Sequence, residues 1–172
     1  EIEKIVKKGD YTLGQKVNEF ERNFAKRVGA KFVIAVGNGT DALYLSLKAL
    51  NIGKGDEVIT VPYTFISTVG AIATAGAKPV FVDIKEDYNI DEKKIKSVIT
   101  KKTKAIMPVH WAGRPCELNK IKTIAKKHNL KIIQDASQAI DSRFKNKQLI
   151  DFGDICAYSM HPLKNLNIWG DG

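Results

Sequence analysis

The chain has 172 residues, of which 44% are hydrophobic and 27% are charged, and its formal net charge is +9. This size and balance are typical of one globular domain with a substantial core. No apolar run approaches the ~20 residues of a membrane-spanning helix, and the opening stretch has a mixed charge that signal peptides lack. The two cysteines lie far apart in the sequence, which suits a reducing compartment. We therefore expect a cytoplasmic protein with no membrane partner.

The excess of positive charge would permit nucleic-acid binding. The lysines, however, are scattered along expected helix faces, without the interleaved aromatic residues that single-strand binders use. A solvated surface is the favoured interpretation, and we expect no nucleic-acid partner. A positive field would also suit an anionic small substrate.

Helical and strand-like stretches alternate along the chain. Apolar residues at helical spacing predict helices at residues 15–29, 41–50, 65–75, 91–99 and 117–128. Short apolar runs predict strands at residues 31–36, 57–61, 78–84, 104–109, 131–134 and 155–159, with a hairpin around residues 145–147. Because these strands are apolar without alternation, both faces of their sheet should be covered. The pattern predicts the α/β class, with a three-layer sandwich around a mainly parallel central sheet.

In such a sheet, ligands bind beyond the carboxyl ends of the strands. The residues that follow the strands are therefore the functional candidates, and they are 37–41, 62–65, 110–115, 135–138 and 159–164.

The last of these stretches carries a lysine in an unusual place. The expected strand ends at Ser159, Pro162 prevents a helix from forming, and Lys164 follows on a short loop. A lysine at a strand end beside a small hydroxyl could form a Schiff base, provided that its surroundings lower its pKa. The ordinary alternative is an exposed loop lysine.

The stretch from Gly37 to Asp41 joins a strand to a helix. Glycines allow close backbone approach, and the first helical N–H groups at Gly39, Thr40 and Asp41 would point outward unpaired, which makes an anion site. The stretch lacks the P-loop signature and the GxGxxG spacing. The alternative is that Thr40 or Asp41 is a simple N-cap.

Three further side chains at strand ends suggest a flat ring as the ligand. Phe65 could stack on such a ring, although ordinary core packing is the commoner role. Asp135 ends a buried strand and could hold a ring nitrogen protonated, or it could cap a short helix. Gln138 could reach the same ligand. His110 also ends a strand, and we expect it to be a hydrogen-bonded structural histidine.

Taken together, these candidates match the parts of one cofactor. They offer a phosphate site, an aromatic plate, a carboxylate for a ring nitrogen, a hydroxyl and a Schiff-base lysine. Pyridoxal 5′-phosphate (PLP) uses all five.

The candidates also lie in an ordered series of short sequence blocks. With these blocks the chain resembles the DegT/DnrJ/EryC1/StrS family of PLP-dependent sugar aminotransferases, which have the fold-type-I architecture. The blocks include residues 9–14, 38–43, 55–59, 64–65, 76–83, 108–110, 135–138, 159–166 and 170–172.

The resemblance implies a role for each candidate. Lys164 would hold PLP as a Schiff base and carry the proton in catalysis. Asp135 would pair with the pyridine nitrogen, Gln138 would approach the ring hydroxyl, and Phe65 would stack on the ring. The phosphate would be held by the backbone at Gly39, Thr40 and Asp41 and by the Ser159 hydroxyl.

The resemblance further implies a homodimer whose substrates are a nucleotide-linked keto-sugar and an amino-acid donor, usually glutamate. Residues 1–172 would be the N-terminal part of the large PLP-binding domain, with the C-terminal small domain absent. Two alternatives remain open. One is a PLP-dependent sugar dehydratase of the same family, although those enzymes carry histidine where this chain has Lys164. The other is a truncated, non-catalytic PLP-fold protein that acts in binding or regulation.

Overall fold

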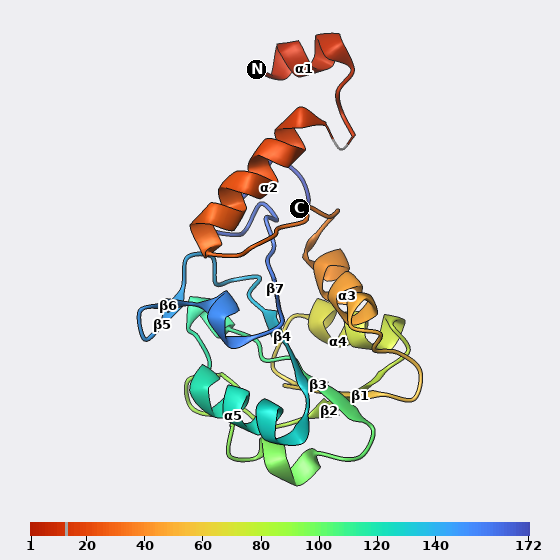
Figure 1. Ribbon diagram of the computed structural model, residues 1–172, viewed down its shortest axis with the longest axis vertical. Helices are drawn as coiled ribbons and strands as arrows, with labels where there is room; N and C mark the ends of the chain where they lie inside the picture. Colours follow the sequence, from red (N-terminus) through yellow and green to blue (C-terminus); the bar gives the residue numbers. More distant parts are fainter. Residues whose placement is uncertain (13) are drawn as a thin grey trace. The chain divides into compact units, whose positions relative to one another are not determined.

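The structure is a computed structural model that describes residues 1–12 and 14–172 (Figure 1). The chain divides into two compact units, Glu1–Ala35 and Val36–Gly172. None of the helices in the described residues has the length and apolar character needed to cross a membrane.

The first unit contains two helices, α1 (Ile2–Lys8) and α2 (Gln15–Val28). The predicted helix at residues 15–29 is confirmed by α2. It ends at Gly29, which takes the left-handed conformation (φ 69°) that a helix C-terminus favours, and its N–H donates to a carbonyl of the last turn.

The strand predicted at residues 31–36 is wrong. This segment forms no ladder with any strand that the structure describes, and Phe32 and Ile34 are 76% and 78% exposed. The N–H of Ala35 donates instead to the Glu21 carboxylate at 2.8 Å. A β-branched composition makes a segment compatible with a sheet, but only a neighbouring strand supplies the hydrogen bonds.

The second unit is built on a five-stranded sheet. Its strands are β1 (Glu57–Thr60), β2 (Lys78–Phe81), β3 (Thr103–Ile106), β4 (Lys131–Asp135) and β7 (Ile155–Ala157). They lie in the order β2-β1-β3-β4-β7, and every neighbouring pair is parallel. The predicted parallel sheet is therefore confirmed, although β7 stops two residues before Ser159.

Two helices cover one face of this sheet (Figure 1). They are α3 (Gly39–Ala49) and α4 (Ile66–Thr74), and they pack on Val58, Ala105 and Ile133. These three side chains come from β1, β3 and β4 and point to the same side, as the period of two in a strand requires.

The other face is covered by α5 (Leu118–His128). Its apolar stripe packs on Ile59, Ile106 and Ile132, the strand neighbours of the residues beneath α3 and α4. Ile59 and Ile106 are fully buried, and each such side chain contributes roughly 1.5–3 kcal/mol. The three-layer sandwich predicted from the sequence is confirmed.

The connections hold the shorter elements. These are the 3₁₀ turns η1 (Ile95–Val98), η2 (Trp111–Gly113) and η3 (Leu149–Phe152) and the two-stranded ribbon of β5 (Arg143–Phe144) and β6 (Lys147–Gln148). The ribbon confirms the predicted hairpin. Its two turn residues, Lys145 and Asn146, have φ of 51° and 65°, as the favoured two-residue hairpin turns require.

The helix predicted at residues 91–99 is corrected to the single turn η1. The Asp91 side chain accepts a hydrogen bond from the Lys93 N–H at 3.0 Å, which holds the preceding residues in a local turn. In the segment that follows, only Ile95 is fully buried. Ile99 takes an extended conformation (φ −70°, ψ 128°), which ends the turn there.

Candidate active site

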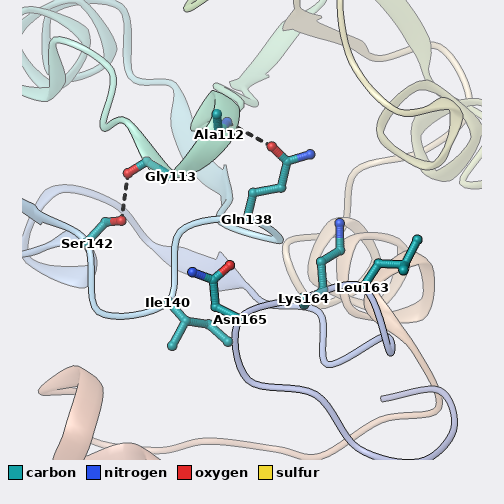
Figure 2. A pocket seen from close by; sticks show the side chains of 8 residues that line it. All are labelled: Ala112, Gly113, Gln138, Ile140, Ser142, Leu163, Lys164 and Asn165. Atoms are coloured by element: carbon teal, nitrogen blue, oxygen red, sulfur yellow. Dashed lines mark hydrogen bonds between the residues drawn. The ribbon is translucent and has the colours of Figure 1, made fainter.

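A pocket of about 420 Å³ opens where the loops after β3, β4 and β7 meet (Figure 2). Its lining comes from all three loops and consists of Ala112, Gly113, Gln138, Ile140, Ser142, Leu163, Lys164 and Asn165. Two predicted site residues, Lys164 and Gln138, therefore line the same pocket. The carboxyl edge of the sheet holds the pocket, as the topology predicts.

Lys164 is held by a tight turn. The His161 carbonyl accepts its N–H at 2.8 Å, and the His161 ring nitrogen Nδ1 accepts the N–H of Leu163 at 3.2 Å. The side chain is half-buried and, in the part of the chain that the structure describes, its ammonium has no carboxylate partner. The amine is thus available to a ligand in the pocket.

Gln138 has a fixed amide orientation. Its Oε1 accepts the N–H of Ala112 at 2.8 Å, so its Nε2 remains a donor (Figure 2). Ser142 donates to the carbonyl of Gly113 at 2.7 Å and ties the same two loops together. Gly113 has φ +82°, and a Cβ there would lie 3.0 Å from the backbone carbonyl oxygen of Gln138. The loop therefore depends on glycine at this position.

Asp135 lies at the end of β4 and is 5% exposed. Its Oδ2 accepts the hydroxyl of Thr68 at 2.7 Å, and its Oδ1 accepts the N–H of Ser137 at 3.1 Å. The bond to Ser137 is a contact within a local turn, and no helix follows Asp135. Asp135 therefore caps a turn and not the short helix of the alternative interpretation. Each carboxylate oxygen keeps acceptor capacity for a ligand.

The first turns of α3 and the end of β7 form a small cradle. Asn38 is the N-cap of α3, because its Oδ1 accepts the N–H of Asp41 at 2.8 Å. The alternative in which Thr40 or Asp41 is the cap is therefore wrong. The Asp41 N–H is occupied by this bond, whereas the N–H groups of Gly39 and Thr40 have no acceptor among the described residues.

Ser159 lies directly beside Gly39. A Cβ added to Gly39 would come within 2.8 Å of the Ser159 Cβ and 3.2 Å of its Oγ. Ser159 is buried, and its Oγ accepts the N–H of His161 at 3.3 Å. The structure thus brings together the hydroxyl and the two unpaired amides that the sequence assigns to a phosphate.

Phe65 is 69% exposed and precedes the first residue of α4. The core-packing interpretation of this side chain is therefore wrong. A large apolar ring left in solvent at the functional edge is consistent with the stacking role, which stays a prediction.

Two hydroxyl groups on α4 that the sequence motifs do not include also contact predicted site residues. Ser67 accepts a hydrogen bond from the Thr40 hydroxyl at 2.7 Å, and Thr68 donates to Asp135. Nothing in the local spacing of the sequence indicated either contact.

His110 is fully buried and has a partner at each ring nitrogen. Nδ1 accepts the N–H of Cys116 at 3.1 Å, so Nε2 carries the proton and donates to the Gln134 Oε1 at 2.9 Å. Burial lowers the pKa of His110 to about 4, against smaller opposing effects of Gln134 and Asp135. These contacts support the structural interpretation of this histidine.

The chain belongs to the DegT/DnrJ/EryC1/StrS aminotransferase family, whose sequence model matches residues 1–172. It is 43% identical over 172 residues to a pleiotropic regulatory protein of Geobacillus stearothermophilus, covering 99% of this chain and 46% of the relative. It is 40% identical over 172 residues to the UDP-2-acetamido-2-deoxy-3-oxo-D-glucuronate aminotransferase of Pseudomonas aeruginosa, covering 99% of this chain and 48% of that enzyme.

The fold is also similar to solved structures. The crystal structure of NtdA from Bacillus subtilis with the bound cofactor PMP matches with a TM-score of 0.94 and 34% identity, over 99% of this chain and 38% of that one. The fold class is therefore that of the aminotransferase relatives. The chain spans about half the length of the curated relatives that it matches.

Proposed function

We propose that the protein is a PLP-dependent aminotransferase that transfers an amino group, from a donor such as glutamate, to a nucleotide-linked keto-sugar. The observation that carries the proposal is that Lys164 and Gln138 line one pocket, with an amine that no carboxylate of the described chain neutralises. A sugar dehydratase is disfavoured because the position holds lysine and not histidine.

The residues present fit the cofactor at both ends. At the phosphate end, the Gly39 and Thr40 amides and the Ser159 hydroxyl lie together, and the space beside Gly39 is one that a Cβ would fill. Amides at a helix N-terminus favour an anion through both hydrogen bonding and the helix dipole. At the ring end, Asp135 offers a buried carboxylate with spare acceptor capacity.

When bound, PLP supplies the electron sink that makes a substrate C–H bond acidic. Asp135 would accept a hydrogen bond from the pyridine N–H and keep that nitrogen protonated. Gln138 would donate its Nε2 proton to the ring oxygen. Lys164 would anchor the cofactor and, once released, take and return the substrate proton.

The comparisons support the same reaction class. The Pseudomonas aeruginosa relative is named as a UDP-sugar aminotransferase, and the Bacillus subtilis structure holds PMP. We propose that residues 1–172 form part of the large cofactor-binding domain. A non-catalytic regulatory role is the second candidate, because the Geobacillus stearothermophilus relative is named for regulation.

The test is cofactor attachment in the full-length protein. Wild type loaded with PLP should be yellow, borohydride should fix the cofactor on the peptide that contains Lys164, and glutamate should convert the bound cofactor to its amine form. Lys164→Ala should abolish the fixation, and Lys127→Ala, an exposed lysine of α5, should not. Colour and fixation that survive Lys164→Ala would contradict the proposal. A wild type that binds PLP without reacting with glutamate would favour the regulatory candidate.

Two further features are proposed with this function. We expect a cytoplasmic protein, supported by the two cysteines, which are unpaired thiols in the described structure. We also expect a homodimer, as the family resemblance implies. Light scattering of the full-length protein should give twice the chain mass, and a monomer that retains full activity would overturn the dimer.

A further inference from the structure

The carboxylate assigned to the cofactor ring is held by a side chain that no part of the proposed mechanism uses. Thr68 is fully buried in the first turn of α4, and its Oγ1 lies 2.7 Å from the Asp135 Oδ2. A second threonine, Thr64, places its Oγ1 2.7 Å from the Thr68 Oγ1. Three polar groups therefore form one chain that reaches from the start of α4 to the end of β4.

The direction of these hydrogen bonds follows from chemistry. An ionised carboxylate only accepts hydrogen bonds, so the single hydroxyl proton of Thr68 must go to Asp135. Thr68 can then only accept from Thr64, which fixes Thr64 as the donor in a contact where either oxygen could otherwise donate. The relay runs from Thr64 through Thr68 to Asp135.

The relay differs from the usual behaviour of a helical threonine. A threonine inside a helix commonly bonds back to a carbonyl of the preceding turn. The Thr68 hydroxyl instead leaves its own helix for a strand residue 67 positions away. Valine would fill the same buried space without a hydroxyl to satisfy, so helix packing alone does not require threonine here.

The carboxylate is restrained at both oxygens. Oδ2 accepts from Thr68 and Oδ1 accepts from the Ser137 N–H, so rotation of the carboxylate plane would break one bond or the other. A fixed orientation is what a partner for a pyridinium N–H needs.

We propose that Thr68, oriented by Thr64, is a positioning residue that sets the orientation of the Asp135 carboxylate toward the ring nitrogen of the cofactor. This inference rests on the proposed function. It extends that function by giving a residue of α4 a part in how Asp135 holds the ring N–H. The sequence motifs did not connect this helix with Asp135.

The experiment uses the full-length protein, freed of cofactor and reloaded with PLP labelled with ¹⁵N in the ring. Two quantities are measured, the Kd for PLP and the ¹⁵N chemical shift of the bound ring, which reports whether the nitrogen is protonated. Thr68→Val removes the hydroxyl at constant shape. Thr68→Ser keeps the hydroxyl and serves as the matched control. Thr64→Val removes only the first donor of the relay.

Thr68→Val should raise the Kd for PLP by about tenfold or more, since a hydrogen bond to a charged group is lost, and should move the ¹⁵N shift toward the unprotonated value. Thr68→Ser should remain close to wild type, and Thr64→Val should shift the signal in the same direction by a smaller amount. If Thr68→Val does not fold, the shift in Thr64→Val decides the question.

The proposal is overturned if the ¹⁵N shift is unchanged in the valine variants, or if serine at position 68 is as damaging as valine. Those outcomes assign Thr68 to packing alone and leave the aminotransferase function intact. Failure of the wild type to bind PLP overturns the proposed function itself, and this inference with it.

Discussion

Gly39 and Ser159 are in direct contact across the entrance of α3. The two residues are 120 positions apart, yet a side chain of a single carbon on Gly39 would approach the Ser159 Cβ to 2.8 Å and its Cα to 3.5 Å. The contact fixes the first helical amides of α3 beside the Ser159 hydroxyl. The candidate phosphate cradle is therefore a product of close packing between one helix start and one strand end.

Gly39→Ala should lower both stability and cofactor affinity. Overpacking of this kind costs roughly 1–3 kcal/mol, because the Ser159 backbone would have to move. Urea unfolding of the full-length protein measures the first effect, and titration with PLP measures the second. Gly70→Ala is the matched control, since a Cβ there meets nothing within 4 Å, and alanine should stabilise α4 by up to about 1 kcal/mol. Equal behaviour of the two variants would contradict the packing argument.

The cap of α3 gives a second prediction. Asn38→Ala removes the acceptor of the Asp41 N–H and should reduce the free energy of unfolding by about 1 kcal/mol. Asn38→Ser keeps a capping oxygen and should stay within a few tenths of a kcal/mol of wild type. Both are read from the midpoint of urea unfolding. Equal stability of the Asn38→Ala and Asn38→Ser variants would contradict the assignment of Asn38 as the N-cap.

A third prediction concerns the donor role of Gln138. Gln138→Glu keeps an oxygen that accepts the Ala112 N–H but replaces the Nε2 donor by a second acceptor. We expect PLP binding at least about tenfold weaker, because a donor to the ring oxygen is exchanged for a negative charge. Thermal unfolding without cofactor should change little, since the loop contact is retained. Unchanged PLP affinity would show that the Nε2 proton has no part in binding.

Much of the site could be predicted because parallel strands share one functional edge. Gln138 and Lys164 both follow a strand, so the order of strands and helices was enough to place them at one edge, where they line one pocket. Thr68 could not be found this way. Its contact with Asp135 depends on the rotation of α4 about its own axis against β4, which local spacing does not determine.

The errors in the fold have a common physical origin. Residues 31–36 carry the composition of a strand but have no neighbouring strand among the described residues, and residues 91–99 carry apolar positions at helical spacing but have a side-chain turn at Asp91 and extended backbone at Ile99. Local preference is weak beside packing and pairing. The sheet of the second unit was predictable because its central strands β1, β3 and β4 place apolar side chains on both faces, where helices cover them.

The free energy of unfolding should depend on pH through the titration of His110. Burial lowers its pKa from 6.5 to about 4, so in the folded chain the ring stays neutral across a range where the unfolded ring is protonated. Between pH 6.5 and pH 4 the unfolded state therefore binds more protons, and the free energy of unfolding falls as the pH falls. The neutral His110 ring leaves the free energy of unfolding at its full value above pH 6.5. At pH 4.5 the free energy of unfolding should be lower by about 2 kcal/mol because of this one group.

His110→Asn tests this directly, because asparagine does not titrate in this range and its side-chain oxygen can still accept the Cys116 N–H. Urea unfolding of the full-length protein at pH 7.5 and pH 4.5 gives the loss for each variant. We expect the loss in His110→Asn to be smaller than that of wild type by about 2 kcal/mol. A loss in His110→Asn equal to that of wild type would mean that His110 titrates alike in the folded and unfolded chains, and that the neutral, doubly bonded ring is the wrong description.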